Sequence, residues 1–161
     1  MTWRGSPDVK DRVFGAFVYA LPLFYSLRFS NYMLGYFPGI FKDILSVIIA
    51  PVALVYGLLG PFANIIIFFA LYLAVIRNDR ISYFIRFNAM QAILIDIFLV
   101  LCSIVTSLFV RGLNGGLLIE TLFNVIFLST LVACFYSMIQ SALGKYAEIP
   151  TISEAAASQV R

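Results

Sequence analysis

Uncharged apolar stretches constrain this chain more than any other feature of its sequence. The longest one runs from Ile44 to Ile76, 33 residues without a charged side chain. As one straight helix it would be about 50 Å long, whereas the hydrocarbon core of a bilayer is about 30 Å thick. The stretch must therefore be broken, and we expect the breaks at Pro51, Gly57 or the Gly60-Pro61 pair.

The composition defines the class of protein. Hydrophobic residues make up 62% of the 161 residues and charged residues 12%, whereas a soluble domain has about 25% charged residues. So few polar side chains cannot cover a water-soluble globule of this size. The net charge of +3 comes from scattered Lys and Arg rather than from a basic stripe, so no nucleic-acid partner is expected. The sequence predicts an all-α integral membrane protein, with residues 1–161 forming a single membrane domain.

Four of the apolar stretches predict transmembrane helices, and a fifth stretch, 39–59, leaves two possibilities open. It either spans the membrane or forms an interfacial or re-entrant amphipathic helix between the first and second spans. The stretch between 111 and 116, RGLNGG, predicts a tight turn between the last two spans. The predicted transmembrane segments are 13–36, 61–76, 84–110 and 117–143, and the polar tail over 145–161 is expected to fray.

The basic residues favour four spans over five. If 39–59 does not span, the N-terminus, the loop near 77–86 and the C-terminal tail share one side, which then holds eight of the eleven Lys and Arg residues. If 39–59 spans, that loop joins the side of Arg28 and Lys42, and the bias disappears. The positive-inside rule therefore predicts four transmembrane helices with both termini cytoplasmic or stromal.

Polar side chains share one face of the third predicted span. At 100° per residue, Asn88, Asp96, Ser103 and Thr106 fall within about 100° of one another, and Gln91 flanks them. The 111–116 turn brings the fourth span alongside, so that Glu120 and Asn124 would lie level with Ser107 and Ser103. We take as the candidate functional seam Asn88, Gln91, Asp96, Ser103, Thr106, Glu120 and Asn124, with Arg86 as an anchor at the membrane interface.

Two interpretations of this seam remain open. Polar side chains can simply hold helices together, each contact contributing about 0.6 kcal/mol. Asp96 favours a functional role beyond helix association, because an aspartate at the centre of a span costs about 2.5–3.5 kcal/mol on insertion scales. Such a residue is expected to face water, a cation or a partner.

The sequence gives no sign of enzymatic chemistry. It contains no His and no GxSxG, HExxH or P-loop motif. Asp96 and Glu120 would lie about 17 Å apart in depth, too far for an acid–base pair. Cys102 and Cys134 would be about 13 Å apart in depth, too far for a disulfide. We therefore predict no enzyme, no catalytic residue, no cofactor and no metal site.

Two stretches resemble a known family. RVFGAFVYALPL, from Arg12, and FFALYLAVIRNDRISYFIRFNAMQAILIDI, from Phe68, are similar to the twenty-kilodalton membrane subunit of the chloroplast inner-envelope protein translocon, in particular to its cyanobacterial and plastid-encoded relatives. The likeness extends over roughly Arg12 to Gly144 and agrees with four helices and both termini inside. The residues that can be carried over as the family signature are Arg86, Phe87, Asn88, Gln91 and Asp96.

The resemblance implies a multi-pass, channel-like subunit for protein transport, without enzymatic activity or cofactor. Its partners would be other membrane subunits and passenger polypeptides, in an oligomer or hetero-complex, because four helices are too few to enclose a polypeptide-sized pore. The membrane would be a cyanobacterial plasma or thylakoid membrane, or the plastid inner envelope.

Two other functions remain open. One is a small assembly or scaffold subunit of a larger photosynthetic or respiratory membrane complex. The other is a small-solute or ion carrier that uses Asp96 as the coupling carboxylate. Scaffolding predicts stable partners after mild detergent extraction, whereas a carrier predicts a coupled flux that Asp96→Asn abolishes.

Overall fold

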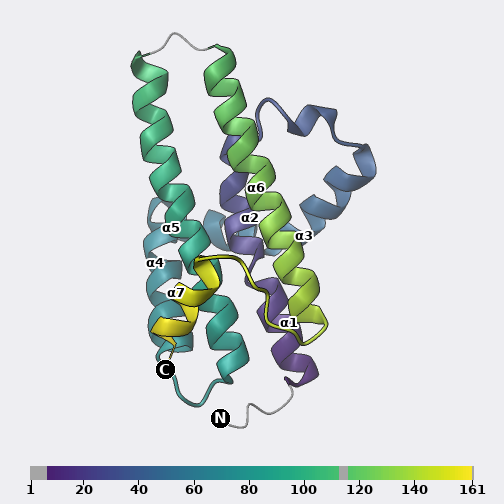
Figure 1. The fold of residues 1–161 in the computed structure, drawn as a ribbon, viewed down its shortest axis with the longest axis vertical. Coiled ribbons are helices and arrows are strands. Elements are labelled where there is room, and N and C mark those ends of the chain that lie inside the picture. Colours follow the sequence, from purple (N-terminus) through teal and green to yellow (C-terminus); the bar gives the residue numbers. More distant parts are fainter. Residues whose placement is uncertain (1–6, 113–115, 161) are drawn as a thin grey trace.

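The computed structural model describes residues 7–112 and 116–160, and every regular element within them is helical (Figure 1). Two long helices, α5 and α6, dominate the molecule, and shorter helical pieces pack around them. The elements are α1 (Val9–Phe17), α2 (Ala20–Ser26), η1 (Leu27–Phe29), η2 (Leu34–Tyr36), α3 (Gly39–Leu59), η3 (Gly60–Phe62), α4 (Ala63–Phe69), the π-helical η4 (Ala70–Ile76), α5 (Tyr83–Gly112), α6 (Leu117–Ala142) and α7 (Ile152–Gln159).

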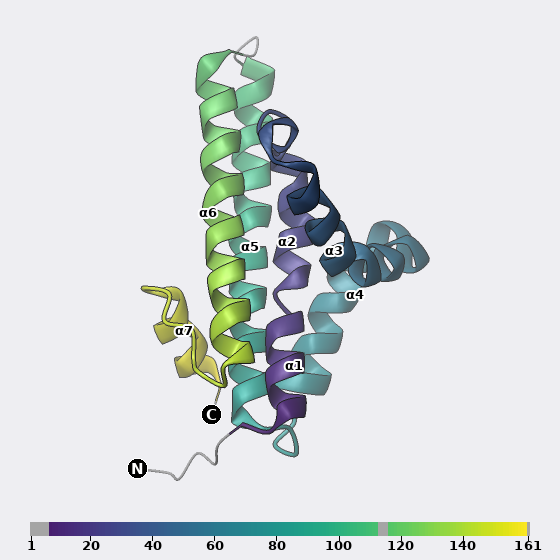
Figure 2. The same cartoon turned by 90° about the vertical axis from the view of Figure 1, so that its right-hand side faces the viewer.

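The core forms where α1 and α2 lie against both long helices. α5 and α6 run antiparallel, and α1 and α2 follow one another along them (Figures 1 and 2). Of the turn predicted over 111–116, residues 111 and 112 belong to the end of α5, and 113–115 lie outside the described residues. The largest fully buried apolar side chains of this core are Tyr19, Leu23, Phe29, Leu99 and Phe127.

Apolar side chains also cover the outside of the molecule. Among the described residues, three helical stretches are long and apolar enough to cross a membrane: Gly39–Ile76, Tyr83–Val110 and Leu117–Ala142. Even in the last of these, only 33% of an apolar segment of 18 residues is buried. Leu108 and Val132 are 64% and 67% exposed. A soluble monomer rarely exposes continuous apolar surface on this scale. The predicted all-α class is confirmed, with three candidate membrane-spanning helices.

Pro22 accounts for the break in the first helical element. A proline ring clashes with the carbonyl four residues before it and lacks an N–H, which places the disturbance at Val18. α1 ends one residue earlier, at Phe17, and α2 begins at Ala20 with Pro22 in its first turn, where the missing N–H costs little. The sequence predicted one kinked span over 13–36; the structure has two helices and two 3₁₀ turns, η1 ending at Phe29 and η2 ending at Tyr36.

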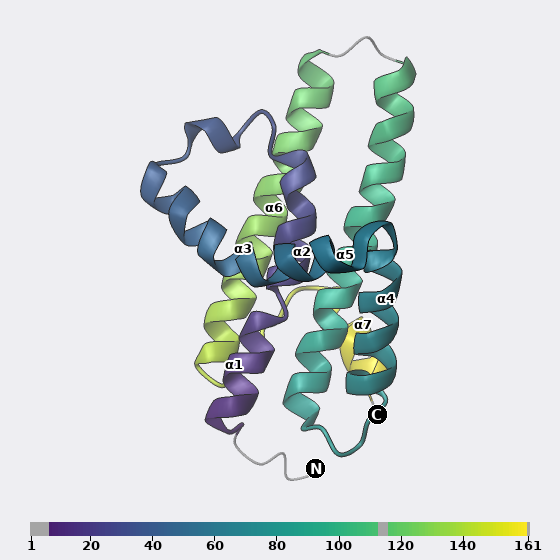
Figure 3. The same cartoon turned by 180° about the vertical axis from the view of Figure 1, so that it is seen from behind.

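The long uncharged stretch is broken once, at Gly60. Its φ of +62° is a left-handed conformation that glycine adopts without strain, and Pro61 follows in a short 3₁₀ turn. Pro51 lies inside α3 without ending it. The segment 39–59, predicted as interfacial or re-entrant, is the single helix α3, whose second half lies across the back of the bundle at mid-height (Figure 3).

Three segments gather at one end of the bundle. The start of α1, the loop between η4 and α5, and the loop that follows α6 all lie there, whereas the 112 and 117 ends of the long helices lie at the other (Figure 1).

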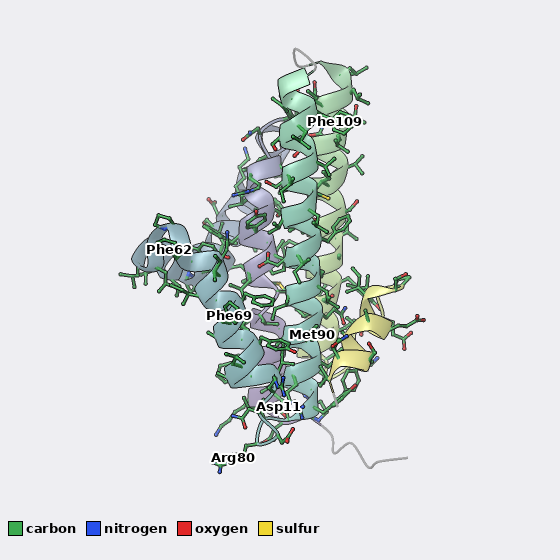
Figure 4. All side chains as sticks on the ribbon, turned by 90° about the vertical axis from the view of Figure 1, so that its left-hand side faces the viewer. Asp11, Phe62, Phe69, Arg80, Met90 and Phe109 are labelled. Carbon is green, nitrogen blue, oxygen red and sulfur yellow. The ribbon has the colours of Figure 1, made fainter. Side chains whose placement is uncertain are left out.

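The C-terminal tail does not fray as the sequence predicted. Residues after α6 return along α5, and α7 packs against its lower half, on the flank opposite α4 (Figures 2 and 4). Ala156 and Val160 are buried there against Phe87, Met90 and Ile93. Polar composition had suggested a loose tail, but the small alanine side chains of α7 allow a close approach to α5.

Gly15 lets α1 approach α5 closely. It is the buried residue of α1, and a Cβ built on it would lie 2.9 Å from Phe84 Cε1 and 3.1 Å from Asn88 Nδ2. Small residues allow this kind of contact between membrane helices, where van der Waals packing replaces the hydrophobic effect as the driving force.

Gly15→Ala is therefore expected to lower the free energy of unfolding by about 1–3 kcal/mol, the usual cost of overpacking. Gly57→Ala is the matched control, because Gly57 is also helical but has nothing within 4 Å of the added Cβ. Thermal unfolding of both variants in detergent measures the difference. Equal midpoints for the two variants would contradict the close contact between α1 and α5.

Candidate functional site

Asn88 lies at the centre of a buried hydrogen-bond node. Its Oδ1 accepts a hydrogen bond from Tyr19 Oη and another from Ser141 Oγ, both at 2.8 Å, and its Nδ2 donates to the Phe84 carbonyl at 2.8 Å. Asn88, Tyr19 and Ser141 are each 0% exposed. The node therefore joins the α1–α2 break, α5 and α6 at a point that water does not reach.

Gln91 lies almost one turn further along α5 and binds the tail. It is fully buried, and its Nε2 donates to the Ala147 carbonyl at 3.3 Å. Ser153 Oγ donates to the same carbonyl at 3.0 Å, which fixes the start of α7. The Oε1 of Gln91 is buried and has no hydrogen-bond partner among the described residues.

Asp96 faces a groove between α2, α4 and α5. The groove has a volume of about 350 Å³ and is lined almost entirely by apolar side chains, with Asn64 as the other strongly polar residue. Within residues 7–112 and 116–160, the Oδ1 of Asp96 is buried without a hydrogen-bond partner. The chain thus holds a carboxylate halfway along its longest helix and leaves that oxygen unpaired.

Arg28 lies near Asp96 but makes its contacts elsewhere. Its Nη1 donates to Tyr25 Oη at 2.8 Å and to Ser103 Oγ at 2.9 Å. The guanidinium also lies over the Tyr25 ring, 4.0 Å from its centroid. Its charge is close enough to act on Asp96, yet no ion pair within 4.0 Å joins the two in the described part of the chain.

The upper part of the predicted seam is satisfied locally or left unpaired. Thr106 Oγ1 donates to the Cys102 and Ser103 carbonyls of its own helix. Asn124 is half-buried, and its Oδ1 has no partner among the residues described. Glu120 is half-buried in the first turn of α6.

Within the described residues, the seven seam residues do not form one hydrogen-bond network. Of the hydrogen bonds described above, only that from Thr106 to the Ser103 carbonyl links two of them; Asn88, Gln91 and Ser103 bind residues outside the predicted set. The polar groups instead form separate contacts stacked along α5: the Asn88 node, the unpaired Asp96, and the Arg28–Ser103 pair.

Arg86 closes the turn between η4 and α5. Its Nε donates to the Ile76 carbonyl at 2.8 Å, and its Nη1 lies 3.3 Å from Asp79 Oδ1. The side chain is 11% exposed. A donor at the end of a helix satisfies a carbonyl that has no intrahelical partner. These contacts therefore hold the Arg86 side chain against the end of η4 and the loop that follows it.

Four residues that take part in these contacts do not belong to the predicted seam. Aromatic side chains in a membrane span usually face lipid or the interface, so the sequence did not place tyrosines in the seam, and Arg28 was counted only among the basic residues that flank the spans. One signal was available: Tyr19 lies three residues before Pro22, within the turn that a proline disrupts. The missed residues are Tyr19, Tyr25, Arg28 and Ser141.

The described residues offer no grouping of three or more His, Cys, Asp or Glu side chains that could hold a metal ion. Cys102 and Cys134 are both free thiols. The site consists of hydrogen-bonding side chains and one unpaired carboxylate, an arrangement suited to binding and helix association.

An apolar exterior with polar groups gathered inside a helical bundle defines an integral membrane protein. A family model described as "Chloroplast import apparatus Tic20-like" matches residues 3–156, and the chain belongs to this family. The resemblance inferred from the two sequence motifs is thereby confirmed.

Relatives in cyanobacteria and plastids match most of the chain. A Tic20 family protein of Synechocystis is 46% identical over 100% of this chain and 99% of its own length. Protein TIC 20-II, chloroplastic, of Arabidopsis thaliana is 32% identical over 93% of this chain and 72% of its own length. The Tic20 family protein Ycf60 of Porphyra purpurea is 31% identical over 99% and 80%.

Asn88→Leu is expected to destabilise the protein by about 1–3 kcal/mol, because it leaves the buried hydroxyls of Tyr19 and Ser141 without their acceptor. Ser107→Ala is the control, since Ser107 is exposed and its hydroxyl donates to the Ile104 carbonyl of its own helix. Chemical or thermal unfolding in detergent gives the comparison. If Asn88→Leu unfolds like the Ser107 control, the node does not hold the three segments together.

Proposed function

We propose that the chain is a membrane-embedded subunit of an inner-envelope-type protein-translocation complex and that it contributes to, or lines, a path for preproteins. The observation that carries the proposal is membership of the Tic20-like family over nearly the whole chain. The absence of any metal-ligand grouping in the described part and the purely binding character of its polar contacts favour a non-enzymatic role.

The proposed topology has four crossings within one membrane domain, residues 1–161. α1, α2 and η1 make the first crossing, and α3 enters the second obliquely, with α4 and η4 completing it beyond the Gly60 break. α5 and α6 make the third and fourth. Both termini would be cytoplasmic or stromal, because Lys10, Arg12, Arg77 and Arg80 lie in the segments at that end.

The seam would act together with partner subunits. Four crossings cannot enclose a polypeptide, so a hydrated path needs walls from other chains. Asn124 supports this role, because its unpaired Oδ1 lies in a span where unsatisfied polar atoms are costly. The path-lining residues are proposed to be the half-buried Ser103, Glu120 and Asn124. Of the other seam residues, Asn88, Gln91 and Thr106 are buried and would hold the helices together, and Asp96 faces the groove between α2, α4 and α5.

A carrier function is the second candidate, and Asp96 is the observation that favours it. An intramembrane carboxylate without a partner is typical of ion-coupled sites. One variant distinguishes the two functions. Asp96→Asn is expected to abolish an ion-coupled flux if the protein is a carrier, whereas a translocation subunit would show no ion-coupled flux in either form.

Cysteine labelling tests the topology. Single cysteines replacing Lys10 and Arg80, in a background without Cys102 and Cys134, are expected to react with an impermeant maleimide from the cytoplasmic or stromal side. Asn31→Cys, in the exposed loop between the first two crossings, is expected to react from the other side. Labelling of Lys10→Cys and Arg80→Cys from opposite faces would contradict an even number of crossings between them.

Photo-cross-linking tests the path. A benzoylphenylalanine at Asn124 is expected to capture an arrested preprotein in membranes active in translocation. The same probe at Val132, which is 67% exposed on the same helix, is expected to capture lipid. No preprotein adduct at Asn124, or equal adducts at both positions, would argue against the path and for a scaffold, whose stable partners would co-purify.

A further inference from the structure

The groove that holds Asp96 opens on one flank of the bundle. Its walls come from α2, α4 and α5, and α4, which carries Phe69, stands beside α5 on the side opposite α7 (Figure 4). Residues at the mouth are substantially exposed, with Ile65 at 59%, Phe69 at 52% and Leu101 at 56%. The groove therefore faces the apolar surroundings of the protein rather than its core.

Among the described residues, Asp96 is the one charged side chain that lines this groove. Its Oδ1 has no hydrogen-bond partner within the described part of the chain. Arg28, the nearby basic residue, is held by Tyr25 and Ser103 and pairs with no carboxylate within 4.0 Å in the residues described. The carboxyl group of Asp96 is thus left without a contact to a cation, next to an apolar opening.

The depth of Asp96 limits what can complete the site. At 1.5 Å per residue it lies about 20 Å from the start of α5 and about 24 Å from its end, so it is near the middle of the span. At such a depth a polypeptide can face lipid only as a helix, because its backbone must satisfy its own hydrogen bonds. Acyl chains reach this depth too, but they bring neither a cation nor a hydrogen-bond donor.

We propose that the groove receives a transmembrane helix of a partner chain and that this helix carries one Lys or Arg at the depth of Asp96. A volume of about 350 Å³ admits side chains but not a helix backbone, so the partner would lie along the mouth and insert its side chains. The cation would pair with Asp96, and the Asn64 amide would accept a further hydrogen bond from it. This inference rests on the proposed role as a subunit of a larger complex, but not on preprotein movement.

The test uses the full chain in phosphatidylcholine vesicles with synthetic transmembrane helices. One alanine–leucine helix carries a central lysine, and its matched control carries leucine at that position. Fluorescence energy transfer between labelled protein and labelled helix measures association. The lysine helix is expected to associate at least tenfold more strongly than the leucine helix.

Charge exchange identifies the contact. Asp96→Asn, which is nearly isosteric, is expected to reduce the preference for lysine to less than twofold. Asp96→Lys is expected to restore selective association with a helix that carries a central aspartate. Restoration by the exchanged pair depends on direct contact between the two charges and cannot result from a loss of folding.

A second pair of variants keeps the carboxylate and changes only the groove. Leu101→Trp fills the mouth and is expected to abolish association, whereas Phe98→Trp is the control, because Phe98 is 54% exposed but does not line the groove. Circular dichroism and thermal midpoints establish that both variants fold.

Several outcomes would overturn the proposal. Equal binding of the lysine and leucine helices would define a general apolar surface without charge recognition. Binding of dodecylammonium in place of any helix, lost in Asp96→Asn, would define a small-amphiphile site instead. No preprotein takes part in this test, so a negative result would not decide whether Asn124 captures a preprotein. The two proposals can therefore fail independently.

Discussion

Hydrocarbon offers no hydrogen-bond partner to a polar side chain, and the structure follows from how this chain meets that constraint. Asn88 provides acceptor and donor groups for three segments at once, two of them far away in sequence. In water such contacts would contribute little to the arrangement of helices. Inside a membrane the same groups must find one another, so the node fixes the α1–α2 break against α5 and α6.

The irregular parts of the backbone serve the same constraint. Pro22 breaks the first helical element where Tyr19 turns inward to Asn88, and Gly15, four residues before Tyr19, removes the side chain that would keep α1 away from α5. Gly60 divides the long apolar stretch, and beyond it α4 leads into η4, which packs against α5. The groove beside Asp96 exists because α4 stands next to α5 there, so the Gly60 break also shapes the candidate docking site.

Much of the fold could be predicted from the sequence, because uncharged apolar runs indicate the segments that lie in lipid and basic residues indicate the loops outside it. The all-α class, the long helical hairpin and the family were accessible from these patterns and from the Arg86–Asp96 motif. The division of the first span and the docking of α7 were not, since they depend on contacts between Tyr19 and Asn88 and between Ala156 and Met90, which no local pattern encodes. Burial along α5 does not follow the predicted polar face alone: Ile95, which is apolar and outside the seam, is buried, whereas Phe98 is exposed.

Oxygen accessibility of spin labels placed one by one along α5, from residue 84 to 110, tests the central claim most directly. If lipid surrounds the bundle and polar groups turn inward, accessibility will oscillate with a period of about 3.6 residues, with maxima at Phe98, Leu101 and Leu108 and minima at Asn88, Ala92 and Leu99. Uniform accessibility, or maxima at Asn88 and Ala92, would show that α5 does not bury its polar side chains within the bundle.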